Sequence, residues 1–292
     1  MVQSLRAVYR LMRASQKFQV GLGIVVFFVV VAAMHPWLLA LLGRGDDPLR
    51  IGMYDPWLVP SPEHPLGTER YGRDVLAMTI KALGVSLLIG AYAGLISTLI
   101  GVVVAFVAGY KGGSIDGVLA TTTDMFLVVP SFPLLLTLSA YVRNVNLLQI
   151  GLMLAIFSWP FAARTIRAQV LSLRSRPYVE LARVTNLNDF EIIFQELLPN
   201  LLPYIGVGFA SAALGAIFAL VGLEVIGLGP ANVVDLGLMI NWALSWGALS
   251  LGAWPIFVAP VIVLALLFTA VNLINIGLEE IYNPRLRGTA GA

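Results

Sequence analysis

The sequence has no cysteine, only two histidines, and an unusually small share of charged residues, 12%. Without cysteine there is neither a disulfide framework nor a thiolate to bind a metal or act as a nucleophile. His35 and His64 both lie near the N-terminal end, and the motifs His-Glu-x-x-His and Gly-x-Ser-x-Gly are absent. The sequence therefore predicts no metal site, no bound cofactor and no hydrolase chemistry.

A nucleotide-binding loop is missing as well. The pattern Gly-x-x-x-x-Gly-Lys-Ser/Thr, which cradles phosphates in many ATPases, does not occur. The chain is therefore not expected to hydrolyse ATP or to be an enzyme. A net charge of +2 gives no reason to expect nucleic acid as a partner.

Hydrophobic residues are abundant and make up 59% of the chain, with a mean hydropathy of +0.88. A soluble domain has about 25% charged residues, twice the share found here. This composition predicts an all-α, polytopic membrane protein in contact with lipid. Six apolar runs are long enough to cross a bilayer: 18–42, 82–110, 118–141, 147–163, 201–226 and 255–277.

The first run follows several basic residues, so a signal peptide is the alternative to a membrane helix. The run is longer than the ~7–15 apolar residues of a signal peptide and more spans follow it. We interpret it as a membrane helix interrupted at His35 and Pro36. In the third run, Pro130 and Pro133 each remove a backbone donor and predict a kink.

The second run carries small residues at regular spacing. Gly90 and Gly94 are four residues apart, and Gly101, Ala105 and Gly109 continue the series. Small residues four apart allow helices to approach closely in lipid, which predicts a helix packed inside the bundle. The alternative is that glycine is simply common in membrane helices.

Basic residues predict the orientation. With the N-terminus in the cytoplasm, the inner segments hold 12 Lys or Arg and the outer segments hold six. Positive charge favours the cytoplasmic side, so both termini are expected there. The inner set is Arg6, Arg10, Arg13, Lys17, Lys111, Arg164, Arg167, Arg174, Arg176, Arg183, Arg285 and Arg287. The outer set is Arg44, Arg50, Arg70, Arg73, Lys81 and Arg143.

Two segments expected on the outer side, and two tryptophans in one of them, are candidates for function. Residues 43–81 form a polar stretch that should fold over the outer face, and residues 227–254 form a Gly-, Trp- and Pro-rich loop without Lys or Arg. In this loop, Trp242 and Trp246 face either a partner at the pathway mouth or the membrane interface.

Two acidic residues within the spans are further candidates for the pathway or gate. Asp124 lies about two turns into the third span and serves either in function or as a partner for a basic group. Glu224 lies ~30 Å beyond Pro203 along the helix. We therefore expect Glu224 to be a solvated carboxylate at the outer end of the fifth span, rather than a substrate ligand.

The longest polar interruption in the second half is the stretch 176–199, in which we expect two short helices with a bend between them. Pro177 suits the first position of a helix, and the macrodipole favours Glu180 in the first turns. Asn188 and Glu191 have the spacing of a capping box, so a second helix should begin there. Asn186 lies at the bend and tolerates left-handed geometry.

Within the second helix, Phe190, Ile193, Phe194 and Leu197 have the spacing of a single apolar stripe. Pro199 and Pro203 are expected to close the unit before the fifth span.

This stretch resembles the EAA loop of ATP-binding-cassette importer permeases. Glu180, Ala182, Ile193 and Leu198-Pro199 match that pattern, whereas Leu181 and Asn186 replace its middle Ala and its Gly. The resemblance implies a coupling helix that docks on a cytoplasmic ATPase. The residues expected to carry the coupling are Tyr178, Glu180, Ala182, Arg183, Asn186 and Pro199. The alternative is a hairpin that merely joins two spans.

Three further segments resemble the C-type subunit of the dipeptide, oligopeptide and nickel branch of these permeases. They are residues 64–76 (HPLGTERYGRDVL), residues 227–230 (GLGP) and residues 283–287 (NPRLR). The first differs from that branch by having Glu69 where Asp is usual. The branch also has an acidic residue where this chain has Leu220, one turn before Glu224.

The resemblance implies a type I importer permease fold that provides half of a translocation pathway by alternating access. Residues 1–80 would hold the first membrane helix and the outer stretch, and residues 81–292 the permease core. Implied partners are a sister permease forming a heterodimer, two cytoplasmic ATP-binding subunits and an extracytoplasmic binding protein. The implied cargo is peptides, with nickel, glutathione or oligosaccharides as alternatives.

Two other classes fit the composition. A secondary transporter would need a coupling-ion site in broken helices and usually an inverted repeat, and we identify neither. A membrane scaffold gives no reason for the coupling stretch.

Overall fold

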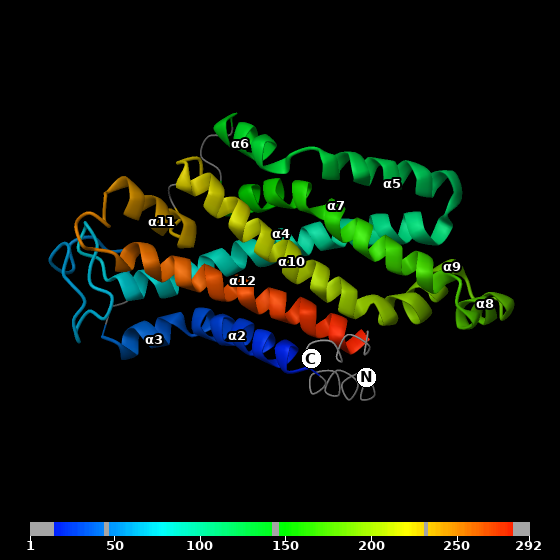
Figure 1. Ribbon diagram of the computed structural model, residues 1–292, viewed down its shortest axis with the longest axis horizontal. Coiled ribbons are helices and arrows are strands. Elements are labelled where there is room, and N and C mark those ends of the chain that lie inside the picture. Colours follow the sequence, from blue (N-terminus) through cyan, green and yellow to red (C-terminus); the bar gives the residue numbers. More distant parts are fainter. Residues whose placement is uncertain (1–14, 44–46, 142–145, 231–232, 283–292) are drawn as a thin grey trace, which may run out of the picture. The chain divides into compact units, whose positions relative to one another are not determined.

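The computed structural model describes residues 15–43, 47–141, 146–230 and 233–282, and its described part is built from helices (Figure 1). They form two compact units, one made of the residues up to Leu88 together with those from Val221, and one of Ile89–Leu220. Helices α4 and α10 contribute to both. The helices are α2 (Gln16–Ala33), α3 (His35–Leu41), α4 (Val75–Lys111), α5 (Gly113–Val128), α6 (Ser131–Tyr141), α7 (Leu147–Arg174), α8 (Pro177–Val184), α9 (Asp189–Glu191), the π-helical turn η1 (Ile192–Leu197), α10 (Leu198–Val225), α11 (Leu236–Ser245) and α12 (Pro255–Tyr282).

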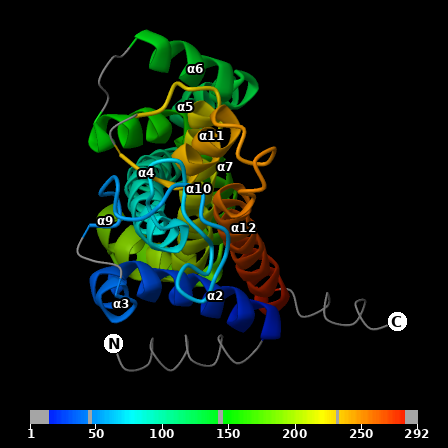
Figure 2. The same ribbon diagram turned by 90° about the vertical axis from the view of Figure 1, so that its left-hand side faces the viewer.

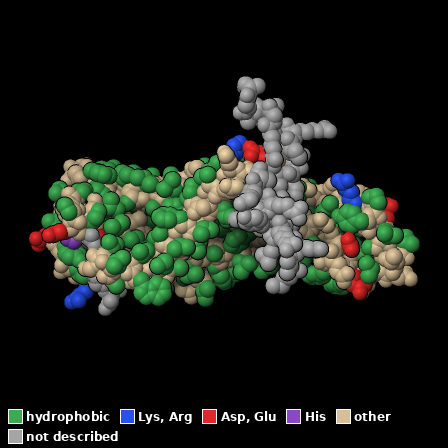
Figure 3. All heavy atoms as spheres, turned by 90° about the horizontal axis from the view of Figure 1, so that it is seen from below, with side chains coloured by type: hydrophobic (Ala, Val, Ile, Leu, Met, Phe, Trp, Pro, Cys, Tyr) green, Lys and Arg blue, Asp and Glu red, His purple; other side chains and the backbone are tan. Residues whose placement is uncertain are grey.

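Five helices in the described part are long and apolar enough to cross a membrane, and a bent pair makes a sixth if α5 and α6 form one span. Hydrophobic side chains predominate on the face shown in Figure 3. The pair α5 and α6 is bent by 76°, which is sharper than the expected kink. Pro130, which has no N–H, lies in the break between them. The all-α, six-span expectation is thus confirmed.

In the first unit, α2 lies along α12, as both views show (Figures 1 and 2). Glycines make this contact close. A Cβ at Gly21 would come within 2.5 Å of the Ala270 carbonyl oxygen, and one at Gly277 within 2.7 Å of the Phe18 Cβ. The predicted interruption at His35 is present, because α2 ends at Ala33 and α3 begins at His35.

The outer stretch of this unit is held by buried polar pairs. The His64 Nδ1 lies 2.7 Å from Asp74 Oδ2, and the Arg73 Nε donates to Glu69 Oε1 at 2.7 Å. Asp74 also accepts from the Ala77 N–H at 2.9 Å and so caps the first turn of α4. The buried ionisable residues of the segment 64–76 therefore form two pairs, His64 with Asp74 and Glu69 with Arg73.

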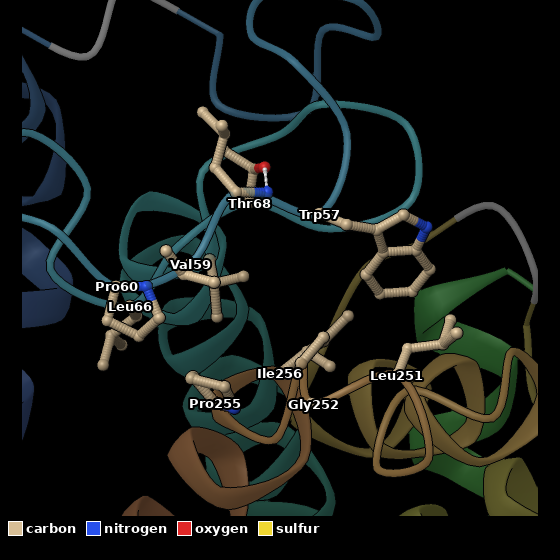
Figure 4. Close-up of a pocket in the computed structure, with 12 residues that line it drawn as sticks. Trp57, Val59, Pro60, Leu66, Thr68, Leu251, Gly252, Pro255 and Ile256 are labelled. Atoms are coloured by element: carbon tan, nitrogen blue, oxygen red, sulfur yellow. Dashed lines mark hydrogen bonds between the residues drawn. The ribbon is translucent and has the colours of Figure 1, made fainter.

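The same stretch packs near the start of α12. Thr68 donates to the Asp55 carbonyl at 2.6 Å and accepts from the Leu58 N–H at 2.9 Å. A hollow of only about 20 Å³ lies between residues 57–68 and residues 251–256 (Figure 4). Trp57 and Ile256 are among the side chains that line it, so little unfilled space separates the two segments.

In the second unit, small residues of α4 pack against α7 and α10. A Cβ at Gly94 would lie 2.8 Å from the Ala213 Cβ, and one at Gly101 would lie 2.8 Å from the Ala162 Cβ. Real Cβ atoms do not approach so closely, so only glycine fits at these two crossings. The prediction that the glycine series places α4 inside a helix bundle is confirmed in this unit.

Candidate functional site

The coupling stretch begins with α8, whose start agrees with the sequence. Arg176 is its N-cap, Pro177 is its first residue and Glu180 lies in its first turn. The helix ends at Val184, and Asn186 has φ 60°. The predicted bend and the left-handed Asn186 are therefore both confirmed.

The next helix begins with the predicted capping box. The Asn188 Oδ1 accepts from the Glu191 N–H at 2.9 Å, and the Glu191 Oε2 accepts from the Asn188 N–H at 2.8 Å. These bonds satisfy two of the free amide groups that every helix start leaves. The start of α9 at Asp189 was thus predictable from two side chains.

The continuation of this helix differs from the prediction. A π-helical turn over Ile192–Leu197 leads directly into α10, so Pro199 and Pro203 do not close the unit. A π-turn has i→i+5 bonds and therefore rotates the side chains away from helical spacing. Phe190, Ile193 and Phe194 line one hollow, as a shared stripe requires, but Leu197 is 0% exposed and does not line it, so the prediction is wrong for Leu197.

One side of the coupling stretch is buried against the end of α4 and parts of α7 and α10. Val179 and Ala182 of α8 share a hydrophobic cluster with Ile192 and Leu197. The cluster is completed by Phe106 and Tyr110 of α4, Ile166 and Val170 of α7, and Leu201 of α10. Hydrophobic packing through Val179 and Ala182 thus holds α8 against these elements.

Polar contacts fix the stretch to α4. The Tyr110 hydroxyl donates to Asp189 Oδ1 at 2.8 Å, and the Arg183 guanidinium lies 5.6 Å from the centre of the Tyr110 ring. Arg174 donates to the Gly109 carbonyl at 2.8 Å, at the end of α4. The contribution of Tyr110 and Asp189 was missed by the sequence analysis, because they are 79 residues apart and neither belongs to a motif.

The other side of the stretch is open. Leu181 is 64% and Val184 is 80% exposed, and Glu180, which directly precedes Leu181, is also exposed on α8. Partial burial raises the pKa of the Tyr178 hydroxyl, which therefore stays neutral. Of the six residues expected to carry the coupling, Ala182 is buried and the other five are exposed: Tyr178, Glu180, Arg183, Asn186 and Pro199. Exposed apolar residues beside charged ones are typical of a surface that binds another protein.

Asp124 lies on α5 and is exposed. Its Oδ1 is 3.7 Å from the Arg164 Nη1 of α7, and both side chains are mostly accessible. The contact matches the alternative in which Asp124 partners a basic group. Whether it also acts in the pathway stays a prediction.

Glu224 differs from its expected environment. It lies in the last turn of α10, as expected, but it is 1% exposed and not solvated. The chain after α10 turns at Gly227, whose φ is 81°, and brings Gly229 and Gly237 against the Glu224 side chain. The position along the helix was right, but the covering segment could not be inferred from a helical distance.

Trp242 lies on α11 and Trp246 is its C-cap, so a helix forms inside the segment expected to be a loop. Their rings stack at 5.4 Å, and the Arg73 guanidinium lies 4.6 Å from the Trp242 ring centre. Tyr71 approaches Trp246 edge-on at 5.5 Å. The two tryptophans therefore belong to an aromatic cluster with the outer stretch of the first unit. A sequence signal for this helix was present and was missed: Asp235 is its N-cap and accepts from the Leu238 N–H at 2.9 Å.

The fold has a counterpart among solved structures. A chain from a crystal structure of inward-facing conformations of the MetNI methionine ABC transporter matches with a TM-score of 0.54 and 17% identity, over 69% of this chain and 97% of that chain. At this identity the match shows the fold, which is that of an ABC importer permease.

Sequence relatives are more similar. The oligopeptide transport system permease protein OppC of Mycobacterium tuberculosis is 34% identical over 232 residues, or 78% of each chain. The dipeptide transport system permease protein DppC of Bacillus subtilis is 31% identical over 280 residues, which cover 96% of this chain and 85% of that protein.

The family model for the inner membrane component of binding-protein-dependent transport systems matches residues 97–288. This chain belongs to that family, and it is a multi-pass component of the inner membrane. The matched range includes the whole coupling stretch. Of the sequence motifs, only residues 283–287 lie outside the described residues.

Proposed function

We propose that this chain is one of two permease subunits of an ATP-driven importer and forms half of a pathway for peptides. The observation that carries the proposal is the coupling stretch, which is packed on one side against α4, α7 and α10 and presents an exposed, partly apolar surface on the other. Two relatives named for oligopeptide and dipeptide transport support peptides as the cargo.

The proposed assembly contains a sister permease, two cytoplasmic ATP-binding subunits and an extracytoplasmic binding protein. The family description, with its reference to binding-protein-dependent transport, supports the last of these. Residues 81–292 carry the permease core, and residues 176–199 transmit movement of the ATPases as a body rigidly attached to the long helices. Burial of Val179 and Ile192 supports this rigidity, because a packed interior transmits displacement.

Both termini are proposed to lie in the cytoplasm, on the side of the coupling stretch. The distribution of basic residues supports this orientation. A cysteine introduced at Ser175 should react only with reagent added from the cytoplasmic side, and one at Ser61 only from outside. Labelling of both from the same side would contradict the proposed topology.

The function is tested by reconstituting the chain in proteoliposomes with the sister permease, the ATPases and the binding protein. We expect dipeptide uptake that depends on ATP. Uptake without ATP would instead indicate a secondary transporter, and failure to co-purify with any ATPase would indicate a scaffold.

The coupling surface is tested by Glu180→Lys, which reverses a charge on the exposed side of α8. A charge-assisted contact that becomes repulsive should lower assembly with the ATPase or peptide-stimulated ATP hydrolysis roughly tenfold to a hundredfold. Glu279→Lys is the matched control, because Glu279 is also exposed but lies near the end of α12. Equal activity of the two variants would show that the stretch is only a connection between spans.

A further inference from the structure

The second unit contains a hollow of about 330 Å³ at the break in the third span. It is lined by four helices: Leu127 comes from α5, Ser131 from α6, Ser158 and Phe161 from α7, and Ser211 from α10. Among the described residues, those that line it are all uncharged. Its size is at the lower end of the range for small-molecule sites, about 300–1,000 Å³.

The depth of the hollow follows from helix geometry. Ser158 lies 11 residues after the start of α7 at Leu147, or about 16 Å along the helix. The hydrocarbon core of a bilayer is about 30 Å thick. A span that begins at Leu147 therefore places Ser158 near the middle of the membrane.

The broken backbone makes lipid an unfavourable occupant of the hollow. At the break, the described backbone bonds include Val129 N–H to Met125 O, and Pro130 has no N–H to donate. The carbonyl groups at the end of α5 and the amide groups at the start of α6 thus lack helical partners. Such groups are tolerated at membrane depth only where protein or a water-filled cavity adjoins them.

The side chains of the hollow are suited to a neutral hydrogen-bonding group. The Ser158 hydroxyl donates to the Leu154 carbonyl at 2.8 Å and keeps its capacity to accept. Ser131 and Ser211 add two more hydroxyls from other helices. Phe161 and Leu135 supply apolar surface. A peptide main chain with variable side chains matches this mixture, because its amide groups are constant and uncharged.

A pair of opposite charges lies one turn away. Asp124 precedes Leu127 by three residues on α5, and Arg164 follows Phe161 by three on α7, which is ~4.5 Å along each helix. Their atoms are 3.7 Å apart and their side chains are 61% and 69% exposed. A long, accessible ion pair is weak. Each member is therefore available to the opposite charge of a bound molecule.

From this arrangement we propose that the hollow and the Asp124–Arg164 pair form a transit site for peptide cargo, in which the serines contact the main chain and the ion pair receives the charged peptide termini. The cargo class, peptides, rests on the proposed function. The location of an aqueous site is independent of that function, because it is argued from the break between α5 and α6, the serine hydroxyls and the exposed Asp124–Arg164 pair.

Because the chain has no cysteine of its own, Ser158→Cys introduces its single thiol. In the reconstituted complex this thiol should react with water-soluble charged methanethiosulfonate reagents, and a transported dipeptide should slow the reaction. Ile156→Cys is the matched control: Ile156 lies two residues away on the same helix, is exposed, and does not line the hollow. Because its side chain lies outside the hollow, the Ile156→Cys thiol should not react with the charged reagents.

The ion pair is tested through the charge of the reagent. Asp124→Asn should favour the anionic reagent at Ser158→Cys, and Arg164→Gln the cationic one, each by about twofold for a unit charge ~9 Å away in water. We also expect both charge variants to lose the protection by dipeptide, because the ion pair is proposed to receive the charged peptide termini.

Three results would overturn the proposal. An unreactive Ser158→Cys would mean that lipid or a sister-permease side chain fills the hollow. Equal reactivity at Ile156→Cys would mean that the labelling is not specific to it. Reactivity without protection by dipeptide, in vesicles that do import dipeptide, would show an aqueous space that the cargo does not enter. If no dipeptide is imported at all, the peptide function fails, whereas the reagent tests still decide whether the space is aqueous.

Discussion

Two polar segments of this membrane protein resemble the same family of permeases, yet the charged side chains of one are mostly buried, whereas those of the other are mostly exposed. In the segment 64–76, Glu69 is 0% exposed and the other charged members His64, Arg73 and Asp74 are buried, apart from Arg70. In the segment 176–199, Glu180 is exposed, and so are the apolar Leu181 and Val184. The first segment pairs its buried charges with one another, whereas the second leaves its surface available.

This difference separates two physical reasons for a motif. Buried charges need partners of opposite sign, since an unpaired one is costly in a low-dielectric interior. Such residues form a motif because they depend on one another. Exposed residues on a packed helix have no such constraint from their own chain, so a motif there indicates another protein. Substitutions in the first segment should therefore affect folding, and those in the second should affect coupling.

The largest effect is expected from Glu69→Ala. This change leaves the buried Arg73 without its 2.7 Å partner and removes the acceptor for the Tyr71 N–H at 2.9 Å. Removing one member of a buried ion pair typically costs about 3–5 kcal/mol. We expect a lower yield of folded protein and a lower thermal midpoint in detergent.

Arg70→Ala is the control for this prediction. Arg70 is adjacent in sequence but exposed, and such surface changes usually stay within about 0.5 kcal/mol. If Glu69→Ala unfolds at the same temperature as Arg70→Ala, the segment 64–76 is not held by its internal pairs and the comparison with 176–199 fails.

An intermediate effect is expected at Asn186, where the backbone has φ 60° and the side chain is exposed. A β-branched residue disfavours this geometry, and left-handed backbone costs ordinary residues roughly 1–2 kcal/mol. Asn186→Val should therefore distort the bend after α8 and lower peptide-stimulated ATP hydrolysis, while the thermal midpoint changes much less than in Glu69→Ala.

Asn186→Gly separates backbone from side chain, because glycine adopts positive φ readily. We expect this variant to keep coupling near the wild-type level. A loss as large as that of Asn186→Val would mean that the Asn186 side chain itself contacts the partner, and that the bend is not the reason for its presence.

The local features of the coupling stretch were predictable from sequence because they depend on nearby residues. The capping box links Asn188 to Glu191, and Pro177 and Asn186 act through their own backbone geometry. The close approach of α4 to other helices was also predictable, since the glycine spacing is regular over Gly90–Gly109. In each case the signal lies within a few turns of one element.

Other features depended on contacts between distant segments. Tyr110 binds Asp189 across 79 residues, and Glu224 is covered by a segment that turns only after Gly227. The π-turn over Ile192–Leu197 joins two elements that the proline positions had suggested were separate. Helical periodicity does not report such contacts, so burial at these positions required the three-dimensional structure.

The smallest effect is expected at Asp235, a buried acid whose neighbour is the acid Glu224 and not a base. Its Oδ1 accepts from the Leu238 N–H and caps α11, and burial raises the pKa of its carboxyl. Asp235→Ala should cost about 1 kcal/mol through loss of the cap, whereas Asp235→Asn retains an acceptor and removes the buried charge.

The pH dependence of the Asp235→Asn variant tests this explanation. A raised folded-state pKa stabilises the protein below the unfolded value of about 3.9, and that contribution is lost as the pH rises through the folded-state pKa. The midpoint of Asp235→Asn relative to wild type should therefore increase between pH 4.5 and pH 8 in thermal unfolding experiments. A difference that is constant or decreases with pH would mean that Asp235 is stabilised as a carboxylate, like the paired charges of the segment 64–76.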